Sequence, residues 1–297
     1  MRPDQQHLRH YFDSPARAGQ WDDLYDTDTL AGVIVRDRHA LALEWINRLG
    51  LRAGASVLDV GCGPGRMAVG LALSGFRLTA VDSSAEMRAR AIARAAEAGA
   101  RDRVAVHSGD AESLEFDNDS FDLVVALGVL PYLAEPQRAL LEFARVTRGG
   151  GYVVVASNNS RRLNRLLDPR FTPLLSPLRD FVRVRRHRRG APRLKRTLPG
   201  CLAGATALLS LRELQRIVTA AGMTPEAIAG VGFGPLTFMG RIVVREPTAI
   251  RLHRSLQTLG SRGVPVIRAI ALQHLILARA GQDPGGSFRA RASPPAL

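Results

Sequence analysis

Residues 57–66 read VLDVGCGPGR, an apolar run that ends in an aspartate and a cluster of glycines. The run predicts a buried strand, and the stretch that follows (65–75, GRMAVGLALSG) predicts a helix. A strand, a glycine-rich turn and a helix in this order place backbone N–H groups and the positive end of a helix at the carboxyl edge of a sheet. Gly61, Gly63 and Gly65 allow positive φ and close approach of a ligand to the backbone. The stretch therefore predicts a site for a nucleotide-like ligand.

The spacing of the glycines and the position of Asp59 restrict the kind of ligand. A dinucleotide fingerprint reads G-x-G-x-x-G, whereas the spacing here is G-x-G-x-G. Asp59 precedes the first glycine by two residues, where its carboxylate would repel a pyrophosphate and attract a cationic group. Asp59 thus indicates a ligand with a positively charged part, or it only ties down the loop by accepting backbone N–H bonds.

Strand and helix patterns alternate after residue 50, which indicates right-handed crossovers and a parallel sheet covered on both faces. The predicted strands read as continuous Val/Leu/Ala runs, as strands buried on both faces do. We expect five strands and three helices in this part, at 56–60, 76–82, 103–110, 120–127 and 150–157, and at 65–75, 84–100 and 135–147.

Helical spacing also marks the flanking segments. Residues 32–49 predict one helix. Residues 210–222 predict another, with Ser210 as N-cap, Glu213 as its capping-box partner and Gly222 at the end. EAIAGVGF (226–233) and HLILARA (274–280) predict strands, with an amphipathic helix before the second. The last residues lack core side chains and predict disorder.

Composition and charge bound the class of protein. The chain has 297 residues, two cysteines in no metal-binding or disulfide pattern, no apolar leader at its start, and no run long enough to cross a membrane. We expect a cytoplasmic protein without a metal, with a peripheral position at the inner face of the membrane as the second interpretation. The net charge is +14 and uneven, because residues 1–156 carry 17 Arg against 21 acids and residues 157–297 carry the excess. The excess indicates an anionic partner, or it is the arginine bias of a GC-rich genome.

The basic excess is greatest in residues 161–196, which carry 12 Arg and one Lys against two Asp. Apolar residues recur there at helix-like intervals, but Pro169, Pro173 and Pro177 forbid one continuous helix. Short amphipathic pieces with a basic face suit a membrane interface. A lid over the active site is the second interpretation, and nucleic-acid binding is the least favoured, since no binding module or interleaved aromatic pattern accompanies the charge.

Three acids end three successive predicted strands. Asp59 ends the first, Asp82 the second and Asp110 the third. The second position suits the two hydroxyls of a ribose and the third an adenine amino group, while the apolar residues of FDLVVALGVLPYL (121–133) suit the faces of the base. Each acid alone is compatible with an ordinary loop cap, but together they favour an adenosine ligand.

These motifs resemble those of class I S-adenosylmethionine-dependent methyltransferases of the small-molecule type. VLDVGCGPG, AVDSSAEM, GDAESLEF, SFDLVVALGVLPYL and ARVTRGGGYVVVAS carry the resemblance over about residues 50–157. YFDSPARAGQWDDLY (11–25) is similar to the N-terminal helical cap of quinone and magnesium-porphyrin methyltransferases. The resemblance implies a Rossmann-like α/β fold with a doubly wound, seven-stranded, mostly parallel sheet, an N-terminal helical cap and late insertions.

The resemblance also implies a domain organisation and a cofactor, S-adenosylmethionine. The expected segments are a cap (1–50), a cofactor-binding core (51–160), a basic insertion or lid (161–205), the rest of the core (206–280) with a second insertion (236–270), and a tail (281–297). In the second insertion, VGFGPLTFMG (231–240) forms part of an acceptor pocket or a turn under the cap. The residues implied in cofactor binding are Trp21, Tyr25, Asp59, Gly61, Cys62, Gly63, Gly65, Asp82, Ser83, Met87, Asp110, Ala111 and Leu127. Trp21 and Tyr25 either close the site or serve as core of the cap.

One departure from the resemblance removes a candidate base. Many relatives have two histidines where this chain has Pro131 and Tyr132. The Pro-Tyr pair is faintly similar to the signature of amino-methylating DNA enzymes, but Val129, two residues before it, cannot accept a bond from a target amine. We expect Tyr132 to contact the substrate. His39 is the first candidate for a general base, ahead of His107.

Methyl transfer to a phenol or carboxylate needs little base catalysis, whereas transfer to an alcohol or to carbon needs a stronger base. We therefore expect O-methylation of a hydrophobic small molecule, such as an aromatic, polyketide, quinone-like or lipid acceptor. The alternatives are N- or C-methylation of a similar acceptor, methylation of RNA through the arginine-rich insertion, and a cofactor-binding module without transfer activity.

Overall fold

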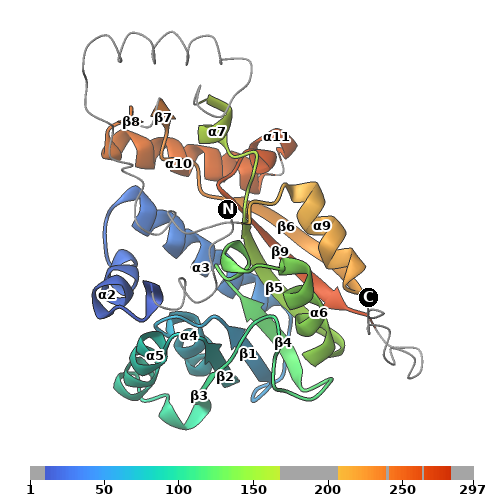
Figure 1. Cartoon of the computed structure of the whole chain (residues 1–297). Coiled ribbons are helices and arrows are strands. Elements are labelled where there is room, and N and C mark those ends of the chain that lie inside the picture. Colours follow the sequence, from blue (N-terminus) through green and yellow to red (C-terminus); the bar gives the residue numbers. More distant parts are fainter. Residues whose placement is uncertain (1–10, 168–206, 239–240, 263, 282–297) are drawn as a thin grey trace, which may run out of the picture.

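The computed structural model describes residues 11–167, 207–238, 241–262 and 264–281. A seven-stranded sheet in the order β3-β2-β1-β4-β5-β9-β6 runs through the molecule (Figure 1). Strands β1 to β5 are parallel, and β9 lies antiparallel between β5 and β6. The strands are β1 Ser56–Val60, β2 Arg77–Asp82, β3 Val104–Ser108, β4 Phe121–Ala126, β5 Thr147–Asn158, β6 Met223–Val231 and β9 Gln273–Ala280. The predicted fold class is confirmed.

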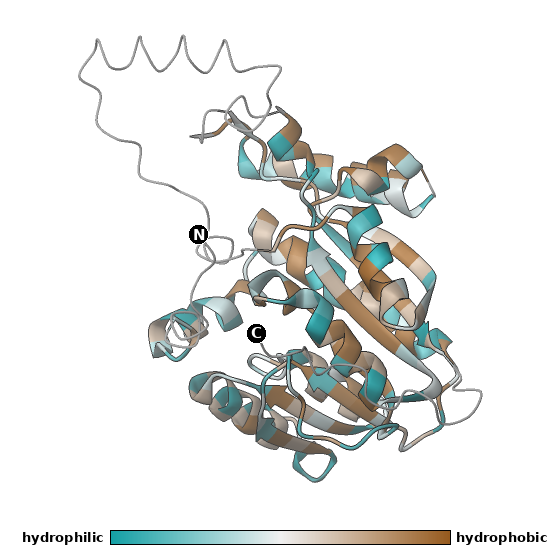
Figure 2. Ribbon diagram, turned by 45° about the vertical axis from the view of Figure 1, so that its right-hand side comes forward, coloured by the Kyte–Doolittle hydropathy of each residue, from teal (hydrophilic) through white to brown (hydrophobic). Residues whose placement is uncertain are grey.

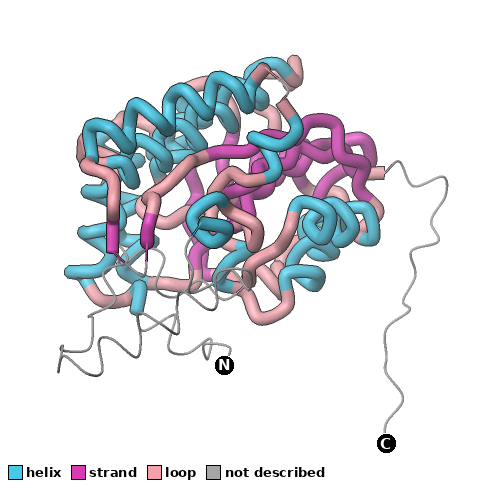
Figure 3. The backbone as a smooth tube through the Cα atoms, turned by 90° about the horizontal axis from the view of Figure 1, so that it is seen from above, coloured by secondary structure: helices cyan, strands magenta, loops and turns pink. Residues whose placement is uncertain are grey.

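Helices cover both faces of this sheet, as the view from above shows (Figure 3). One face carries α3, α4 and α5, and the opposite face carries α6 and α9. The helices are α2 Pro15–Leu24, α3 Leu30–Arg48, α4 Arg66–Leu73, α5 Ala85–Glu97, α6 Pro136–Val146, α7 Leu163–Leu167, α9 Leu211–Ala220, α10 Glu246–Ser261 and α11 Pro265–Ala269, with short 3₁₀ turns at η1 Arg101–Arg103 and η2 Leu130–Tyr132.

The core consists of two apolar clusters, one on each side of the sheet. On one side, Leu71 and Ile46 belong to the same cluster as the strand residue Val57. On the other side, Phe143 and Leu214 belong to the same cluster as the strand residue Leu58. Figure 2 shows hydrophobic residues concentrated on the strands and hydrophilic residues more frequent on the helices. Burial of this apolar area is the main favourable contribution to folding.

Two elements differ from their sequence-based expectations. Strand β3 lies at the edge of the sheet, so Ala105 and His107 are exposed, although continuous burial is expected of a parallel strand. Helix α3 was expected in a separate cap, but Ala42 and Ile46 belong to the apolar cluster beside the sheet. Helix α3 is therefore part of the helical layer, whereas α2 lies outside it.

The later elements follow their predicted caps closely. Ser210 and Glu213 form a reciprocal capping box at the start of α9, and Gly222 has a φ of +83° after its end. In the described part of the predicted insertion at 236–270, β7 (Thr237–Phe238) pairs antiparallel with β8 (Arg241–Ile242), and α10 and α11 follow.

The expected basic insertion or lid (161–205) lies mostly outside the described residues. The expected tail (281–297) also lies outside them, apart from its first residue. Within the described ranges, no helix is both long enough and apolar enough to span a membrane.

Candidate functional site

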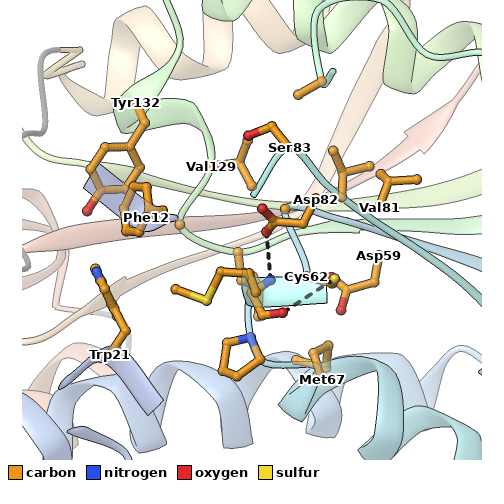
Figure 4. A pocket seen from close by; sticks show the side chains of 18 of the residues that line it. Phe12, Trp21, Asp59, Cys62, Met67, Val81, Asp82, Ser83, Val129 and Tyr132 are labelled. Carbon is orange, nitrogen blue, oxygen red and sulfur yellow. Dashed lines mark hydrogen bonds between the residues drawn. The ribbon is translucent and has the colours of Figure 1, made fainter. Parts of the chain in front are cut away.

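A cavity of about 180 Å³ lies at the carboxyl edge of β1, β2 and β4. Every residue expected to bind the cofactor lines it except Gly65, and His39 and Tyr132 line it as well. In Figure 4, Asp59, Cys62 and Asp82 lie on one side of the cavity, and Phe12, Trp21 and Tyr132 lie on the other. The structure thus gathers residues from the whole first half of the chain at one edge of the sheet.

The glycine-rich turn has the conformation that only glycine adopts easily. Gly61, Gly63 and Gly65 have φ of +63°, +53° and +79°. A Cβ at Gly61 would lie 2.3 Å from Val129 Cγ2, so a side chain there would collide with the loop after β4, whereas a Cβ at Gly63 would meet open space. The turn is therefore shaped both by backbone conformation and by close packing.

Gly65 is placed differently from the other two glycines of the turn. It does not line the cavity but is the N-cap of α4, and a Cβ there would lie 2.9 Å from the Cα of Ala91 on α5. The reason for glycine at this position is the close approach of α5 to the turn. Its spacing from Gly63 does not distinguish this packing role from ligand binding.

Asp59 is buried in the cavity wall at the end of β1. Its Oδ2 has no hydrogen-bond partner among the described residues, and burial, together with the neighbouring Asp82, raises the pKa of Asp59 to about 8. The carboxyl group is therefore largely protonated at neutral pH unless a cation binds beside it. A free carboxyl oxygen of this kind suits a ligand with an ammonium or sulfonium group.

Asp82 holds the turn and the next helix together. Its Oδ2 accepts a bond from Gly63 N at 2.9 Å, drawn in Figure 4, and its Oδ1 accepts one from Ser84 N at 2.9 Å. Burial raises the pKa of Asp82, although these two bonds oppose that effect. Each carboxylate oxygen has a second lone pair for a ligand hydroxyl.

The remaining predicted contacts form the walls. Ser83 and Met87 follow β2, Asp110 and Ala111 follow β3, and Leu127 follows β4. Asp110 Oδ1 accepts a bond from Glu112 N at 3.0 Å. Burial raises the pKa of the Cys62 thiol well above its ordinary value, so Cys62 serves as a small apolar wall residue rather than as a nucleophile.

Helix α2 covers the cavity and is held there by ion pairs. Asp22 accepts bonds from Arg94 Nη2 at 2.6 and 2.7 Å and from Arg66 Nε at 2.8 Å. Trp21 and Tyr25, on the same segment, reach the cavity, and the Arg66 guanidinium stacks on the Tyr25 ring at 4.9 Å. The structure places both aromatic residues at the cavity, as expected if they close it.

His39 lies in the cavity wall with its ring edge-on to Tyr25, 5.9 Å between centroids. Burial, with smaller contributions from Arg38 and Arg66, lowers the pKa of His39 to about 4. The imidazole is therefore neutral at physiological pH but is a weak proton acceptor. His107, the second candidate base, is exposed on β3 and is not among the described lining residues.

Sequence reasoning missed Arg38, which lines the cavity and is only 4% exposed. Its Nη1 donates to Gln273 Oε1 at 3.3 Å and its Nη2 to the Tyr25 hydroxyl at 3.5 Å. Within the described ranges it forms no ion pair, so a buried cation faces the cavity without an anion. The signal was present, because Arg38 occupies the apolar face of α3 four residues after Ile34 and four before Ala42.

A second cavity, of about 490 Å³, adjoins the first. The two cavities share Trp21, Arg38, Gly128 and Tyr132 in their walls. Much of the second wall is apolar and comes from α3, β9 and the insertion after β6, for example Leu30, Ile34, Val35, Val244, Ala249 and Leu272. A cavity of this size and character suits a hydrophobic small molecule.

The stretch 231–238 lines the second cavity and also packs under α3. Pro235 lines the second cavity, while a Cβ at Gly232 would lie 2.8 Å from Ile34 Cγ2, so the turn packs under α3. Behind it, the buried His253 of α10 accepts a bond from Phe233 N at 3.2 Å, and its Nε2 lies 2.8 Å from Asp37 Oδ2. This histidine therefore ties the insertion to α3.

Comparison with known proteins agrees with this geometry. The family model described as "Methyltransferase domain" matches residues 58–155, from β1 to β5. The 27-O-demethylrifamycin SV methyltransferase of Amycolatopsis mediterranei (strain S699) is 31% identical over 214 residues, 72% of this chain and 68% of that protein. The phosphatidylethanolamine N-methyltransferase of Cereibacter sphaeroides is 37% identical over 108 residues, 36% of this chain and 53% of that protein, so this match spans about half the length of the relative.

Solved structures show the same fold. Magnesium protoporphyrin IX methyltransferase from Synechocystis PCC 6803, with bound S-adenosylmethionine, superposes with a TM-score of 0.59 at 14% identity and covers 95% of this chain and 99% of that one. The [4+2]-cyclase SpnF superposes with the same TM-score at 19% identity and covers 95% of this chain and 98% of that one.

The chain belongs to the S-adenosylmethionine-dependent methyltransferases of the small-molecule type. The residues of the first cavity fit this cofactor, because the unpartnered oxygen of Asp59 and the unpaired cation of Arg38 suit an ammonium group and a carboxylate, and both groups occur in its methionyl part.

Proposed function

We propose that the protein transfers a methyl group to the oxygen of a hydrophobic small molecule that carries an acidic hydroxyl group. The observation that carries the proposal is the second, largely apolar cavity, which meets the cofactor cavity at Trp21, Arg38, Gly128 and Tyr132. An acceptor in the second cavity would meet the cofactor at this junction. Tyr132, the expected substrate contact, belongs to both walls.

In the first cavity we assign the cofactor contacts as follows. Arg38 pairs with the methionyl carboxylate, Asp59 with the ammonium group, and Asp82 accepts bonds from the ribose hydroxyls. Met87 and Ala111 pack on the adenine, and Leu127 lies beside the methyl group. All of these residues line the cavity, and Arg38 and Asp59 there have no oppositely charged partner among the described residues.

When bound, S-adenosylmethionine supplies an electrophilic methyl group on a sulfonium. The leaving group is a neutral thioether, so no acid is needed, and the chain's contribution is to align the reactants and exclude water. Helix α2 excludes water by covering the cavity. His39, with a pKa of about 4, is a weak base. This favours an acceptor that ionises readily, such as a phenol, an enol or a carboxylic acid, over an alcohol.

Calorimetric titration with S-adenosylmethionine, with NAD as control, is the first test. We expect micromolar binding of the former and none of the latter. Asp82→Ala should abolish binding while circular dichroism shows an intact fold, and Glu97→Gln, an exposed change on α5, should leave affinity unchanged. Unchanged affinity of the Asp82 variant would refute the ribose contact.

A second test identifies the methylated atom. 2-Naphthol and 2-naphthylamine share one ring system, so mass spectrometry of their products compares an acidic hydroxyl with an amine. We expect the methyl ether from the naphthol. Methylation of the amine alone would replace O-methylation by N-methylation, the activity named for the Cereibacter relative.

A further inference from the structure

A polar strip interrupts the apolar wall of the second cavity. It consists of Arg38 on α3, Gln273 on β9 and Asn158 at the end of β5, and all three side chains line this cavity. Asn158 and Gln273 are direct cross-strand neighbours in the antiparallel β5–β9 pair, so their side chains project from the same face of the sheet.

We infer that Asn158 determines acceptor specificity by presenting an N–H donor, so that the acceptor carries a hydrogen-bond-accepting oxygen, such as a carbonyl, beside the hydroxyl that is methylated. The inference rests on the proposed function, because it takes the second cavity as the acceptor site.

The orientation of the two side-chain amides in the strip, those of Gln273 and Asn158, follows from the chemistry of Arg38. Arginine can only donate, so Gln273 must turn its Oε1 toward Arg38, at 3.3 Å from Nη1. The Gln273 Nε2 then faces Asn158 and donates to Asn158 Oδ1 at 2.9 Å. Asn158 Oδ1 is thereby engaged, and its Nδ2 is left as the group available to a ligand. Reversing either amide would place donor against donor.

The free amide end of Asn158 is well positioned to select a ligand. Asn158 is 3% exposed, and its Nδ2 has no hydrogen-bond partner among the described residues. Because Asn158 lines the cavity, a ligand that fills the cavity excludes water from this donor. A ligand oxygen that accepts its bond therefore gains affinity, and a ligand without such an oxygen leaves the donor buried and unpaired.

Two further side chains at the junction of the cavities also present donors. Trp21 lines both cavities, and its Nε1 is buried without a partner in the described part of the chain. Arg38 Nε is likewise buried without a hydrogen-bond partner in the described part of the chain. The two acids in the wall of the second cavity do not offset these donors. Glu246 already accepts a bond from Leu30 N at 2.7 Å, and Asp23 is exposed to solvent. The junction therefore favours an oxygen-rich or anionic acceptor over an amine.

Two ring-matched probes test the inference by calorimetry in the presence of S-adenosylhomocysteine. 1-Hydroxy-2-acetonaphthone has a carbonyl beside its hydroxyl, and 1-naphthol lacks it. We expect the wild-type protein to bind the first roughly tenfold more tightly. Asn158→Asp, which replaces the donor by an acceptor of the same shape, should abolish this preference and leave cofactor affinity unchanged within about twofold.

Asn47→Asp is the matched control, because Asn47 is exposed on α3 and makes no hydrogen bond within the described ranges. Asn158→Leu, which removes the amide without adding charge, should also remove the preference. Equal affinities for the two probes, failure of the acetonaphthone to bind, or a preference that survives both Asn158 variants would overturn the inference. Transfer is measured separately by product mass, so selective binding without methylated product would count against the proposed function alone.

Discussion

At the scale of single residues, the raised pKa of Asp59 leads to two predictions. Its folded-state pKa of about 8 lies far above the ordinary value of 3.8. Between these two pH values the folded state holds a proton that the unfolded state has released. The stabilising contribution is therefore complete below about pH 4 and is lost as pH rises through 8.

Asp59→Asn should remove this pH dependence, because the amide has the shape of the protonated acid and does not ionise. We expect the variant to gain stability relative to the wild type as pH rises from 4 to 8. Urea unfolding across this range measures the difference. A difference in free energy of unfolding that stays constant with pH would contradict the assigned pKa.

The same residue predicts proton release on cofactor binding. A cationic ligand favours ionised Asp59, so binding of S-adenosylmethionine near pH 7 should release roughly one proton. Calorimetry in buffers of different ionisation enthalpy measures this number directly. In Asp59→Asn the release should disappear, and its persistence would mean that another group supplies the proton.

The acids of the site could be predicted from the sequence because they end predicted strands, and parallel strands end at one edge of a sheet. Asp59, Asp82 and Asp110 all line the cavity as expected. Gly65 and Arg38 could not be assigned in this way. The function of Gly65 depends on the approach of α5, which local sequence does not show. Arg38 is visible in the sequence as a charge on the apolar face of α3, but its function depends on the absence of an acid partner, which local sequence does not show.

At the scale of elements, α2 is attached to the core mainly by charge. Asp22 forms ion pairs with both Arg66 and Arg94, and its side chain is only 14% exposed. The segment before α2 adds two further bonds, from Ser84 Oγ to Phe12 O and from Ala85 N to Asp13 Oδ1. These contacts hold the aromatic side chains of the segment against the cavity.

Asp22→Asn should therefore loosen α2 and accelerate loss of the cofactor. We expect the dissociation rate to rise roughly tenfold, since partly buried charge-assisted bonds are lost. Stopped-flow displacement measures this rate. Asp23→Asn is the matched control, because Asp23 is exposed and forms no ion pair within the described ranges. Equal rates in the two variants would show that α2 does not retain the cofactor.

The capping box of α9 tests a purely structural element. Ser210→Ala removes the bond to Glu213 N and should lower the free energy of unfolding by about 1 kcal/mol. Cofactor affinity should not change, because α9 lies on the opposite face of the sheet from α4 and α5. A change in affinity would show that the two faces are coupled.

Sequence patterns identified most elements because helix caps and strand periodicity are local signals. They did not reveal that α3 belongs to the helical layer, since Ala42 and Ile46 read equally well as the core of a separate cap. Nor did they indicate that the second cavity would combine α3 with β9 and the insertion after β6, because this contact joins residues more than 200 positions apart.

At the scale of the whole molecule, cofactor binding should stabilise the fold by mass action. At a free concentration of 100 times Kd, S-adenosylmethionine adds about 2.7 kcal/mol. For a chain of this size the expected rise in Tm is roughly 5 °C. Thermal melts with and without the cofactor measure it, with NAD and the Asp82→Ala variant as controls that should show no rise. A rise with NAD would indicate a less selective site.

The walls of the two cavities come from different parts of the chain. Apart from Gly128, Pro131 and Tyr132, the described residues that line the second cavity lie outside the stretch 58–155 that matches the family model, whereas most of the first wall lies within it. Under the proposed function, substitutions at residues that line only the second cavity, such as Leu30, Val244 and Leu272, should alter the acceptor and leave cofactor binding unchanged. The proposed donor and acceptor sites thus draw most of their residues from separate stretches of one chain, so the acceptor range can be engineered at positions that do not touch the cofactor cavity.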